Sequence, residues 1–380
     1  LFASPSFAPH RPPRVSPPLP AAPSHRYNAL VKGWCDKRRA ERAYEVVQTM
    51  QQVGLKPDAV SWGSMVKGFC DLHDMKNAER MFEMAQETGV PPNNVLFNSL
   101  IKGWCDDGNV TRAEAAKEQM LRLGLHPDVR TYTTLVRGWA VEGNMTRATA
   151  IFEKMKGNGI QPNQVTFNSI AKGWCDNKNM ARASDVIKEL RAASMKPDVV
   201  TWTTLITGFA AVGNMVKAEE LLTDMEVDGV PPNLFTFNAM VKGWCASAVG
   251  TSGRAGRSEK KRWTRSGGGG SPAAKPKQPG DVSSGMLRAE AVLISMQRVG
   301  VKPNHETYNA LIRGYGHRGE LLECDRCFSE LKRSGVEVTV RTYNALMSAF
   351  IMAKPRTARN EDRALNSFEE QLEAGIRPDR

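Results

Sequence analysis

The feature that most constrains the fold is a short motif that returns at a fixed interval along the chain. The sequence Lys-Gly-Trp-Cys-Asp occupies residues 32–36, 102–106 and 172–176, and Lys-Gly-Trp-Cys returns at 242–245. Related versions lie midway between these copies, so the repeating unit is 35 residues long. A period of this length indicates stacked supersecondary units, each of which buries its apolar surface only against its neighbours.

The pattern of apolar residues within a unit predicts two helices. We number each unit from 1 to 35, with Asn28 at position 5 of the first unit. Apolar residues at positions 4, 7, 8 and 11 form one helical face, and a second stripe runs from position 17 to position 27. Gly-Asn pairs, as at 108–109, separate the stripes, and Gly-x-x-Pro-Asp/Asn closes the unit. We therefore expect an all-α chain that forms a right-handed α-solenoid superhelix of helix–turn–helix repeats.

The chain divides into nine units, two of which are interrupted. The seventh unit carries 36 additional residues between its helices, and the ninth carries five around Lys354-Pro355-Arg356. We expect a disordered proline-rich tail, a first part of the array (units 1–6 and the first helix of unit 7), a disordered basic glycine-rich insert, and a second part of the array (the second helix of unit 7 and units 8–9). These segments are 1–23, 24–245, 246–285 and 286–380. The units begin at Ser24, Ala59, Asn94, Val129, Gln164, Val199, Leu234, His305 and Val340.

The net charge of +12 lies mostly outside the repeats. Residues 1–35 supply +4 and residues 246–281 supply +6, which leaves about +2 for the rest. Bulk charge is therefore a weak argument for a nucleic-acid partner. The tail contains Pro, Ser, Ala and Arg but no acidic residue up to residue 24, a composition that fits either the remnant of an organellar transit segment or a plain disordered tail.

These units resemble pentatricopeptide repeats of the plain 35-residue class, called P-type. The resemblance rests on stretches such as Val-Thr-Phe-Asn-Ser-Ile at 165–170 and Gly-Ile-Gln-Pro-Asn at 159–163, and it covers residues 24–380 apart from the insert. The tetratricopeptide repeat has a 34-residue period and a different signature. The resemblance implies binding of single-stranded RNA, with one base read by each repeat, in mitochondria or chloroplasts. The implied roles are RNA processing, stability, splicing or translation.

The resemblance implies that positions 5 and 35 together choose the base. In the family, Asn with Asp favours uracil, a small residue or Thr with Asn favours adenine, and Asn with Asn favours either pyrimidine. The expected RNA therefore reads approximately U-A-U-A-U-A-Y-Y-U, from 5′ to 3′ as the chain runs from its N-terminus to its C-terminus. The pairs are Asn28/Asp58, Gly63/Asn93, Asn98/Asp128, Thr133/Asn163, Asn168/Asp198, Thr203/Asn233, Asn238/Asn304, Asn309/Thr339 and Asn344/Asp379.

Two further rows complete the predicted RNA interface. Position 9, one turn beyond position 5 on the same helical face, is mostly basic and suits the phosphate backbone; it holds Lys32, Lys67, Lys102, Arg137, Lys172, Lys242 and Arg313. Position 2 is usually aliphatic in the family and wedges between bases. The fitting residues are Val60, Val95, Val165, Val200 and Phe235, whereas His25, Arg130, Glu306 and Arg341 depart from that pattern.

The sequence gives no convincing sign of catalysis, of a resident cofactor or of a membrane span. Cys324-x-x-Cys327 lacks the His-x-Glu and Pro-Cys context of a zinc deaminase, and the repeated cysteines are expected to be small buried residues. We expect a monomeric RNA-binding protein without enzyme activity, with proteins of RNA processing as additional partners. Two alternatives remain: a protein-binding scaffold like tetratricopeptide arrays, or the repeat part of a larger enzyme such as a protein-only ribonuclease P or an editing factor.

Overall fold

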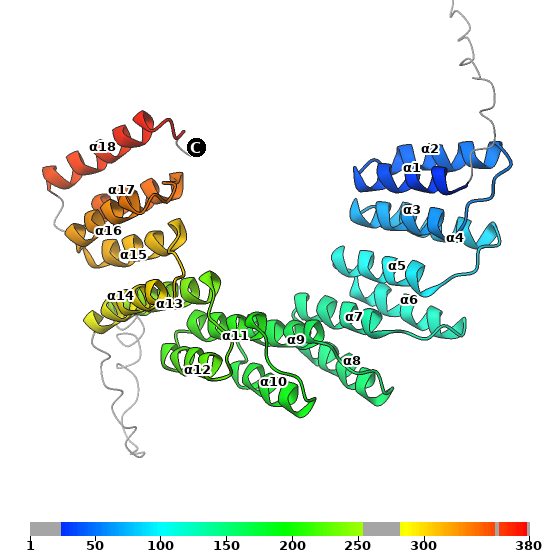
Figure 1. Ribbon diagram of the computed structural model, residues 1–380, viewed down its shortest axis with the longest axis horizontal. Coiled ribbons are helices and arrows are strands. Elements are labelled where there is room, and N and C mark those ends of the chain that lie inside the picture. The colour runs from blue at the N-terminus through cyan, green and yellow to red at the C-terminus, as the bar shows by residue number, and fades with distance from the viewer. Residues whose placement is uncertain (1–23, 254–281, 354–356, 378–380) are drawn as a thin grey trace, which may run out of the picture. The chain divides into compact units, whose positions relative to one another are not determined.

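The chain was described from a computed structural model, which covers residues 24–253, 282–353 and 357–377. These residues form eighteen α-helices and no strand (Figure 1). The helices alternate as the sequence predicts, with a first and a second helix in every unit. The all-α fold of helix–turn–helix repeats is therefore confirmed. None of the described helices is long and apolar enough to cross a membrane.

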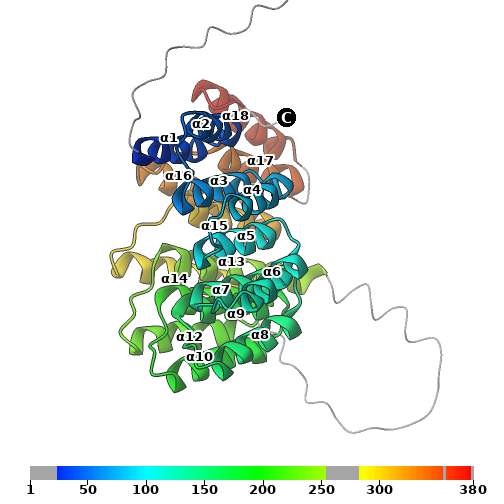
Figure 2. The same ribbon diagram turned by 90° about the vertical axis from the view of Figure 1, so that its right-hand side faces the viewer.

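The array consists of two compact parts, residues 1–162 and residues 163–380. In each part, successive first helices pack on one another, and each second helix packs on the first helix of its own unit (Figures 1 and 2). The first part contains α1 (Ser24–Asp36), α2 (Ala40–Gln52), α3 (Ala59–Asp71), α4 (Met75–Glu87), α5 (Asn94–Asp106), α6 (Val110–Arg122), α7 (Val129–Val141) and α8 (Met145–Gly157).

The second part contains the other ten helices. Its core is built on the same plan as the first, since Trp202, Leu205 and Ile206 are as fully buried as Trp62, Met65 and Val66 at the same positions of the unit. These helices are α9 (Gln164–Asp176), α10 (Met180–Ala192), α11 (Val199–Ala211), α12 (Met215–Val227), α13 (Leu234–Gly253), α14 (Val282–Arg298), α15 (His305–Arg318), α16 (Leu321–Arg333), α17 (Val340–Met352) and α18 (Ala358–Glu373).

The recurring Gly and Cys of the motif are explained by contact between neighbouring units. A Cβ atom added to Gly68 at position 10 would lie 2.6 Å from Sγ of Cys35 at position 12 of the preceding unit. The same relation joins Gly103 to Cys70, at 2.5 Å. The first helices thus approach closely because one residue of each pair has no side chain. All seven cysteines are free, and burial raises the pKa of the Cys70 thiol to about 12.

The turns between the two helices of a unit follow the predicted Gly-Asn chemistry. Gly108 and Gly143 adopt left-handed φ angles of 80°, and Asn109 and Asn144 then cap the second helices by accepting backbone N–H bonds. Where the glycine is missing, other residues adopt the same conformation, as Lys178 does with a φ of 59°.

The interrupted seventh unit keeps its hairpin. Helix α13 continues to Gly253, beyond the expected boundary at 245, and α14 begins at Val282, before the expected boundary at 286. The two helices pack on each other like those of an uninterrupted unit. Arg288 of α14 lies 4.9 Å over the Trp244 ring and forms an ion pair with Glu219. Arg147 does the same with Trp139 and Glu114, so α14 is a regular second helix. The predicted insert of 246–285 otherwise falls largely outside the described residues, as does the tail 1–23.

Candidate nucleic-acid interface

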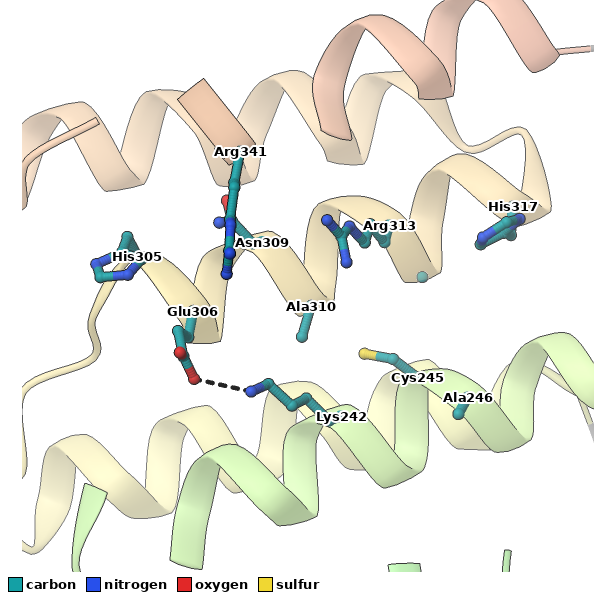
Figure 3. Close-up of a pocket in the computed structure, with 11 residues that line it drawn as sticks. Lys242, Cys245, Ala246, His305, Glu306, Asn309, Ala310, Arg313, His317 and Arg341 are labelled. Atoms are coloured by element: carbon teal, nitrogen blue, oxygen red, sulfur yellow. Dashed lines mark hydrogen bonds and ion pairs between the residues drawn. The ribbon is translucent and has the colours of Figure 1, made fainter. Parts of the chain in front are cut away.

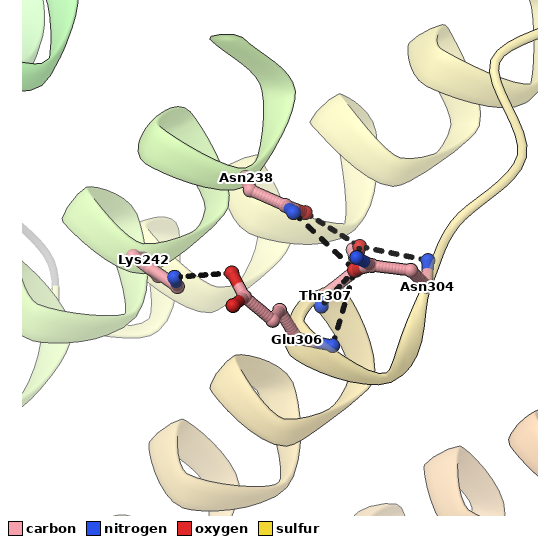
Figure 4. A network of polar contacts seen from close by, with 5 residues as sticks. All are labelled: Asn238, Lys242, Asn304, Glu306 and Thr307. Carbon is pink, nitrogen blue, oxygen red and sulfur yellow. Dashed lines mark hydrogen bonds and ion pairs between the residues drawn. The ribbon is translucent and has the colours of Figure 1, made fainter. Parts of the chain in front are cut away.

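Described hydrogen bonds join the residues at positions 5 and 35 in four units, where each pair lies at the N-terminal end of stacked first helices. Nδ2 of Asn28 donates to both carboxylate oxygens of Asp58, at 3.1 and 2.9 Å. Asn98 and Asp128 form the same contact at 3.3 Å to each oxygen. The other two pairs are Asn168 with Asp198, at 3.3 and 3.4 Å, and Asn238 with Asn304, at 3.2 Å (Figure 4).

The side chain at position 35 is held in place because it caps the N-terminus of a helix. Asp58 precedes α3 and accepts hydrogen bonds from the backbone N–H groups of Val60 and Ser61. Such caps satisfy donors that have no partner inside the helix and fix the direction of the capping side chain. The capping carboxylate therefore stands beside the first helix of the preceding unit. The residues that cap in this way are Asp58, Asn93, Asp128, Asn163, Asp198, Asn233 and Asn304.

A third residue, at position 3 of the following unit, completes each contact and was missed by the sequence analysis. The hydroxyl of Thr131 donates to Oδ1 of Asn98 at 2.6 Å, while Nδ2 of that amide donates to Asp128. The sequence contains a signal for this residue, because Ser or Thr recurs at position 3 of the units. The other hydroxyl contacts join Ser61 to Asn28 at 2.5 Å, Thr201 to Asn168 at 2.5 Å and Thr307 to Asn238 at 2.6 Å.

Two of the carboxylates in these contacts, Asp58 and Asp198, are held in their charged form. Burial acts to raise the pKa of Asp58, but hydrogen bonds from Ser61, Asn28 and the backbone outweigh it, so that the pKa lies below its ordinary value. Asp198 shows the same balance, with hydrogen bonds from Thr201, Asn168 and Gln164. The negative charges of Asp58 and Asp198 are therefore stable near neutral pH.

The remaining pairs differ in their geometry. Gly63 has no side chain to meet Asn93, and its absence leaves a pocket of about 310 Å³ between Lys32, Lys67 and Val60. Thr203 bonds to the hydroxyl of Thr236 at 2.7 Å, and that hydroxyl in turn bonds to Asn233.

The other three pairs differ from one another in what the structure describes. Thr133 and Asn163 belong to two different compact parts, and their pairing stays a prediction. Asn344 is half-buried on α17, whereas Asp379 lies outside the described residues. Asn309 is buried, and its Oδ1 has no hydrogen-bond partner within the described parts of the chain, so it does not bond to Thr339.

The predicted wedging residues are exposed although they are apolar. Val60, Val95 and Val165 expose 58%, 66% and 58% of their surface, and Phe235 exposes 72%. Val200 is exposed to the same degree. Each stands in the first turn of a first helix, three residues before the buried or half-buried position 5. An apolar side chain repeated at one exposed place on successive units is consistent with a binding surface rather than with packing.

The basic row at position 9 is exposed but carries acidic neighbours that the sequence analysis overlooked. Lys102 lies 3.5 Å from Asp71 and 3.2 Å from Asp106, both at position 13, and Arg137 pairs with Asp106 at 3.0 Å. Lys242 pairs with Glu306 at 2.8 Å. Because of these pairs, the row is less strongly cationic than position 9 alone indicates. Lys32, Lys67, Lys172 and Arg313 make no ion pair within the described residues.

An opening with a volume of about 460 Å³ lies on this surface where the seventh, eighth and ninth units meet. Figure 3 shows Arg313 and His317 on α15, Arg341 reaching in from α17, and the ion pair of Lys242 with Glu306 at one side. The opening corresponds in position to the pocket at Gly63, where Asp36 and Asp71 stand in place of Ala246 and His317. It is therefore the more cationic of the two.

Comparison with family models decides which family these repeats belong to. The model of the PPR repeat family matches residues 24–71, 165–210, 197–246 and 303–352, and that of the pentatricopeptide repeat domain matches 116–177 and 286–318. Two further PPR repeat models match 60–90 and 88–121. The chain is a pentatricopeptide repeat protein. The resemblance to the P-type class, with its 35-residue unit, is thereby confirmed over most of the described array.

Individual relatives support the same assignment and cover only parts of known proteins. A pentatricopeptide repeat-containing protein of Arabidopsis thaliana is 42% identical over 38 residues, which are 10% of this chain and 7% of that protein. Among solved structures, the pentatricopeptide repeat protein PPR10 from maize aligns with a TM-score of 0.58 and 23% identity, over 95% of this chain and 51% of its own. This chain thus spans about half the length of the maize protein.

A yeast protein of lower sequence identity has a similar structure. The structure of Rmd9p in complex with a 16-nucleotide target RNA aligns with a TM-score of 0.50 and 10% identity, over 92% of this chain and 80% of its own. At these levels of identity the two structural matches show a shared fold of stacked helical hairpins.

The Cys-x-x-Cys of this pentatricopeptide repeat protein lies inside α16. Cys324 and Cys327 are buried, and burial raises the pKa of both thiols to about 12. Within the described residues, no group of three or more potential ligands is arranged to hold a metal ion. The burial of both side chains agrees with the expectation that they are small core residues of a second helix.

Proposed function

We propose that this protein binds single-stranded RNA, with each unit contacting one nucleotide. The observation that carries the proposal is the recurrence, on successive first helices, of a half-buried or buried polar residue at position 5 beside an exposed apolar residue at position 2. Asn98 with Val95 and Asn168 with Val165 are examples. An amide can bond to the edge of a base, while an apolar side chain packs against its face.

The pairing of positions 5 and 35 supports a definite target sequence. Asn with Asp, as in Asn28/Asp58, Asn98/Asp128 and Asn168/Asp198, favours uracil in this family, and Gly63 with Asn93 or Thr203 with Asn233 favours adenine. The proposed RNA is 5′-UAUAUAYYU-3′, in which Y is either pyrimidine. Yeast Rmd9p, which shares the fold, was solved in complex with a 16-nucleotide target RNA, and this supports RNA as the ligand here.

We further propose an organellar role, in a mitochondrion or chloroplast, in the processing, stability, splicing or translation of the bound transcript. The binding module itself carries no chemical step in this proposal. The buried thiols of Cys324 and Cys327 support that view, because a thiol must ionise to ligate a metal or act as a nucleophile.

Fluorescence anisotropy with labelled nonamers tests the proposal. The RNA 5′-UAUAUACUU-3′ is expected to bind more tightly than a scrambled nonamer of the same composition, and affinity is expected to fall as salt rises because phosphate contacts release counterions. Equal competition by the scrambled RNA would contradict sequence-specific binding. A duplex of the same sequence serves as the control for single-strand preference.

A further inference from the structure

The contacts at position 3 make the position-5 amide a hydrogen-bond donor of fixed orientation. A carboxylate can only accept hydrogen bonds, so the amide atom of Asn98 that faces Asp128 must be Nδ2. Oδ1 then faces Thr131, whose hydroxyl donates to it at 2.6 Å. The same geometry recurs around Asn28 and Asn168. At Asn238 the amide oxygen of Asn304 takes the place of the carboxylate (Figure 4). Between a carboxylate and a hydroxyl, the amide has no second orientation that satisfies both.

The oxygen of such an amide already accepts one short hydrogen bond and is held facing the hydroxyl. Only 9% of the surface of Asn98 is exposed, and Oδ1 is already bonded to the hydroxyl. Nδ2 lies at nearly equal distances from both oxygens of Asp128, as expected when one hydrogen is shared between them. The second Nδ2 hydrogen remains, so the unit offers an incoming base a donor of fixed orientation.

We propose that the position-3 hydroxyl is a specificity-determining positioning residue, which selects uracil over cytosine by holding the position-5 amide as a donor. Uracil presents a carbonyl oxygen at ring position 4, which accepts from Nδ2. Cytosine presents an amino group there, and two donors then face each other. This inference rests on the proposed function, because it concerns how the RNA surface discriminates between the two pyrimidines.

Beside the eighth unit, the position-3 hydroxyl has a different hydrogen-bond partner. Thr339 replaces the acidic cap, and the hydroxyl of Thr342 lies 3.1 Å from the hydroxyl of Thr339. Oδ1 of Asn309 is consequently buried with no hydrogen-bond partner in the described structure. A buried acceptor without a partner costs free energy, which a ligand that donates a hydrogen can recover. The amide of this unit is therefore free to accept from cytosine or to donate to uracil.

The experiment compares nonamers that differ only at the third nucleotide, which faces Asn98. Wild-type protein should bind 5′-UAUAUACUU-3′ more tightly than 5′-UACAUACUU-3′. Thr131→Val removes the hydroxyl and keeps the side-chain shape, and it should reduce the uracil-to-cytosine affinity ratio by about three- to tenfold, the range of one net hydrogen bond. Thr131→Ser retains the hydroxyl and should restore the ratio.

Thr342→Val is the matched control for Thr131→Val. Each substitution removes a hydroxyl that accepts a hydrogen bond from the backbone N–H of the capping residue. The distance is 3.2 Å from Asp128 to Thr131 and 3.4 Å from Thr339 to Thr342. Only Thr131 also bonds to a position-5 amide. Thr342→Val should therefore leave the uracil-to-cytosine affinity ratio at the eighth nucleotide unchanged. If Thr131→Val does not fold, Thr201→Val gives the same measurement at the fifth nucleotide, opposite Asn168.

The outcomes separate the two levels of the proposal. If Thr131→Val weakens both RNAs equally and keeps the ratio, the hydroxyl has only a structural role and the inference is wrong, while RNA binding stands. A drop in the ratio that serine also fails to restore argues against the hydroxyl in the same way. If wild-type protein binds no single-stranded RNA, the proposed function fails and the role of the hydroxyl fails with it.

Discussion

Cys35 packs against Gly68 so closely that a Cβ atom on the glycine would stand 2.6 Å from the cysteine Sγ. The relation is reversed at the end of the array, where Gly316 occupies position 12 and a Cβ added there would overlap Ala349 at position 10. The contact between neighbouring first helices thus tolerates a side chain on either helix but not on both.

The need for a glycine on one side of this contact predicts the effect of Gly68→Ala. The added methyl group overfills the contact, and we expect the free energy of unfolding to fall by about 1–3 kcal/mol. Cys35→Gly removes the atoms that the methyl group would meet, so the double variant should lose less stability than the sum of the two single variants. Urea denaturation of all four proteins measures the coupling. Additive losses would show that the two residues do not determine the spacing of α1 and α3.

Acid should weaken the array through the capping carboxylates. The pKa of Asp198 is lowered from its ordinary value of 3.8 by hydrogen bonds that outweigh the effect of burial. A lowered folded-state pKa contributes stability that is fully present above the unfolded-state pKa and is lost as pH falls through the folded-state pKa. Asp198→Asn keeps a good cap and should flatten the loss of stability below pH 3.8.

Thermal melts between neutral pH and acid pH test this expectation. Asp107→Asn is the control, because Asp107 is exposed and stands at the C-terminal end of α5 rather than at the N-terminal cap of a helix. An acid dependence that is as steep in Asp198→Asn as in the wild type would show that the cap carboxylate contributes nothing to it.

The sequence was sufficient for the repeat, the two helices per unit and the buried positions, because each depends on local periodicity that the array multiplies. It was insufficient where the important partner lies in the next unit. The hydroxyl of Thr131 and the amide of Asn98 are 33 residues apart in sequence, and Asp106 lies beside Arg137 only because α5 and α7 stack. Neither relation follows from the pattern within one unit, although both repeat once the stacking is known.

The ion pairs along position 9 predict unequal contributions to RNA binding. Lys172 is exposed and makes no ion pair within the described residues, whereas Lys102 lies close to Asp71 and Asp106. Lys172→Ala should weaken RNA binding more than Lys102→Ala, and should reduce the slope of log affinity against log salt by roughly 0.7, the value for one contact to a single strand. Anisotropy titrations at several salt concentrations measure both effects, and equal slopes for the two variants would contradict the difference.

The exposed wedge at Phe235 should matter for binding and not for folding. Its ring exposes 72% of its surface, so Phe235→Ala removes little packing. Stacking of a base on an aromatic ring contributes about 1–3 kcal/mol, which corresponds to a loss of at least several-fold in affinity. Val227→Ala is the matched control, since Val227 is 80% exposed on the second helix α12. A large fall in melting temperature, or equal affinities for the two variants, would exclude wedging by Phe235.

The eighth unit offers a gain of specificity. Asn309 lacks the acidic neighbour that Asn28, Asn98 and Asn168 have, because Thr339 caps α17 and engages the hydroxyl of Thr342. Thr339→Asp places a carboxylate at the position of Asp128, which should accept from Nδ2 of Asn309. The Thr342 hydroxyl then becomes available to Oδ1 of Asn309.

The variant should therefore acquire a preference for uracil over cytosine at the eighth nucleotide, by about three- to tenfold. Competition between 5′-UAUAUACUU-3′ and 5′-UAUAUACCU-3′ measures it, with the third nucleotide as an internal reference that should not change. Thr339→Asn separates the effect of the negative charge from the effect of side-chain shape. An amide oxygen at position 35 can accept from a position-5 amide, because Asn304 accepts from Asn238 at 3.2 Å. If adding Thr342→Val to Thr339→Asp leaves the new preference intact, the carboxylate alone determines it and the hydroxyl plays no part in selecting the base.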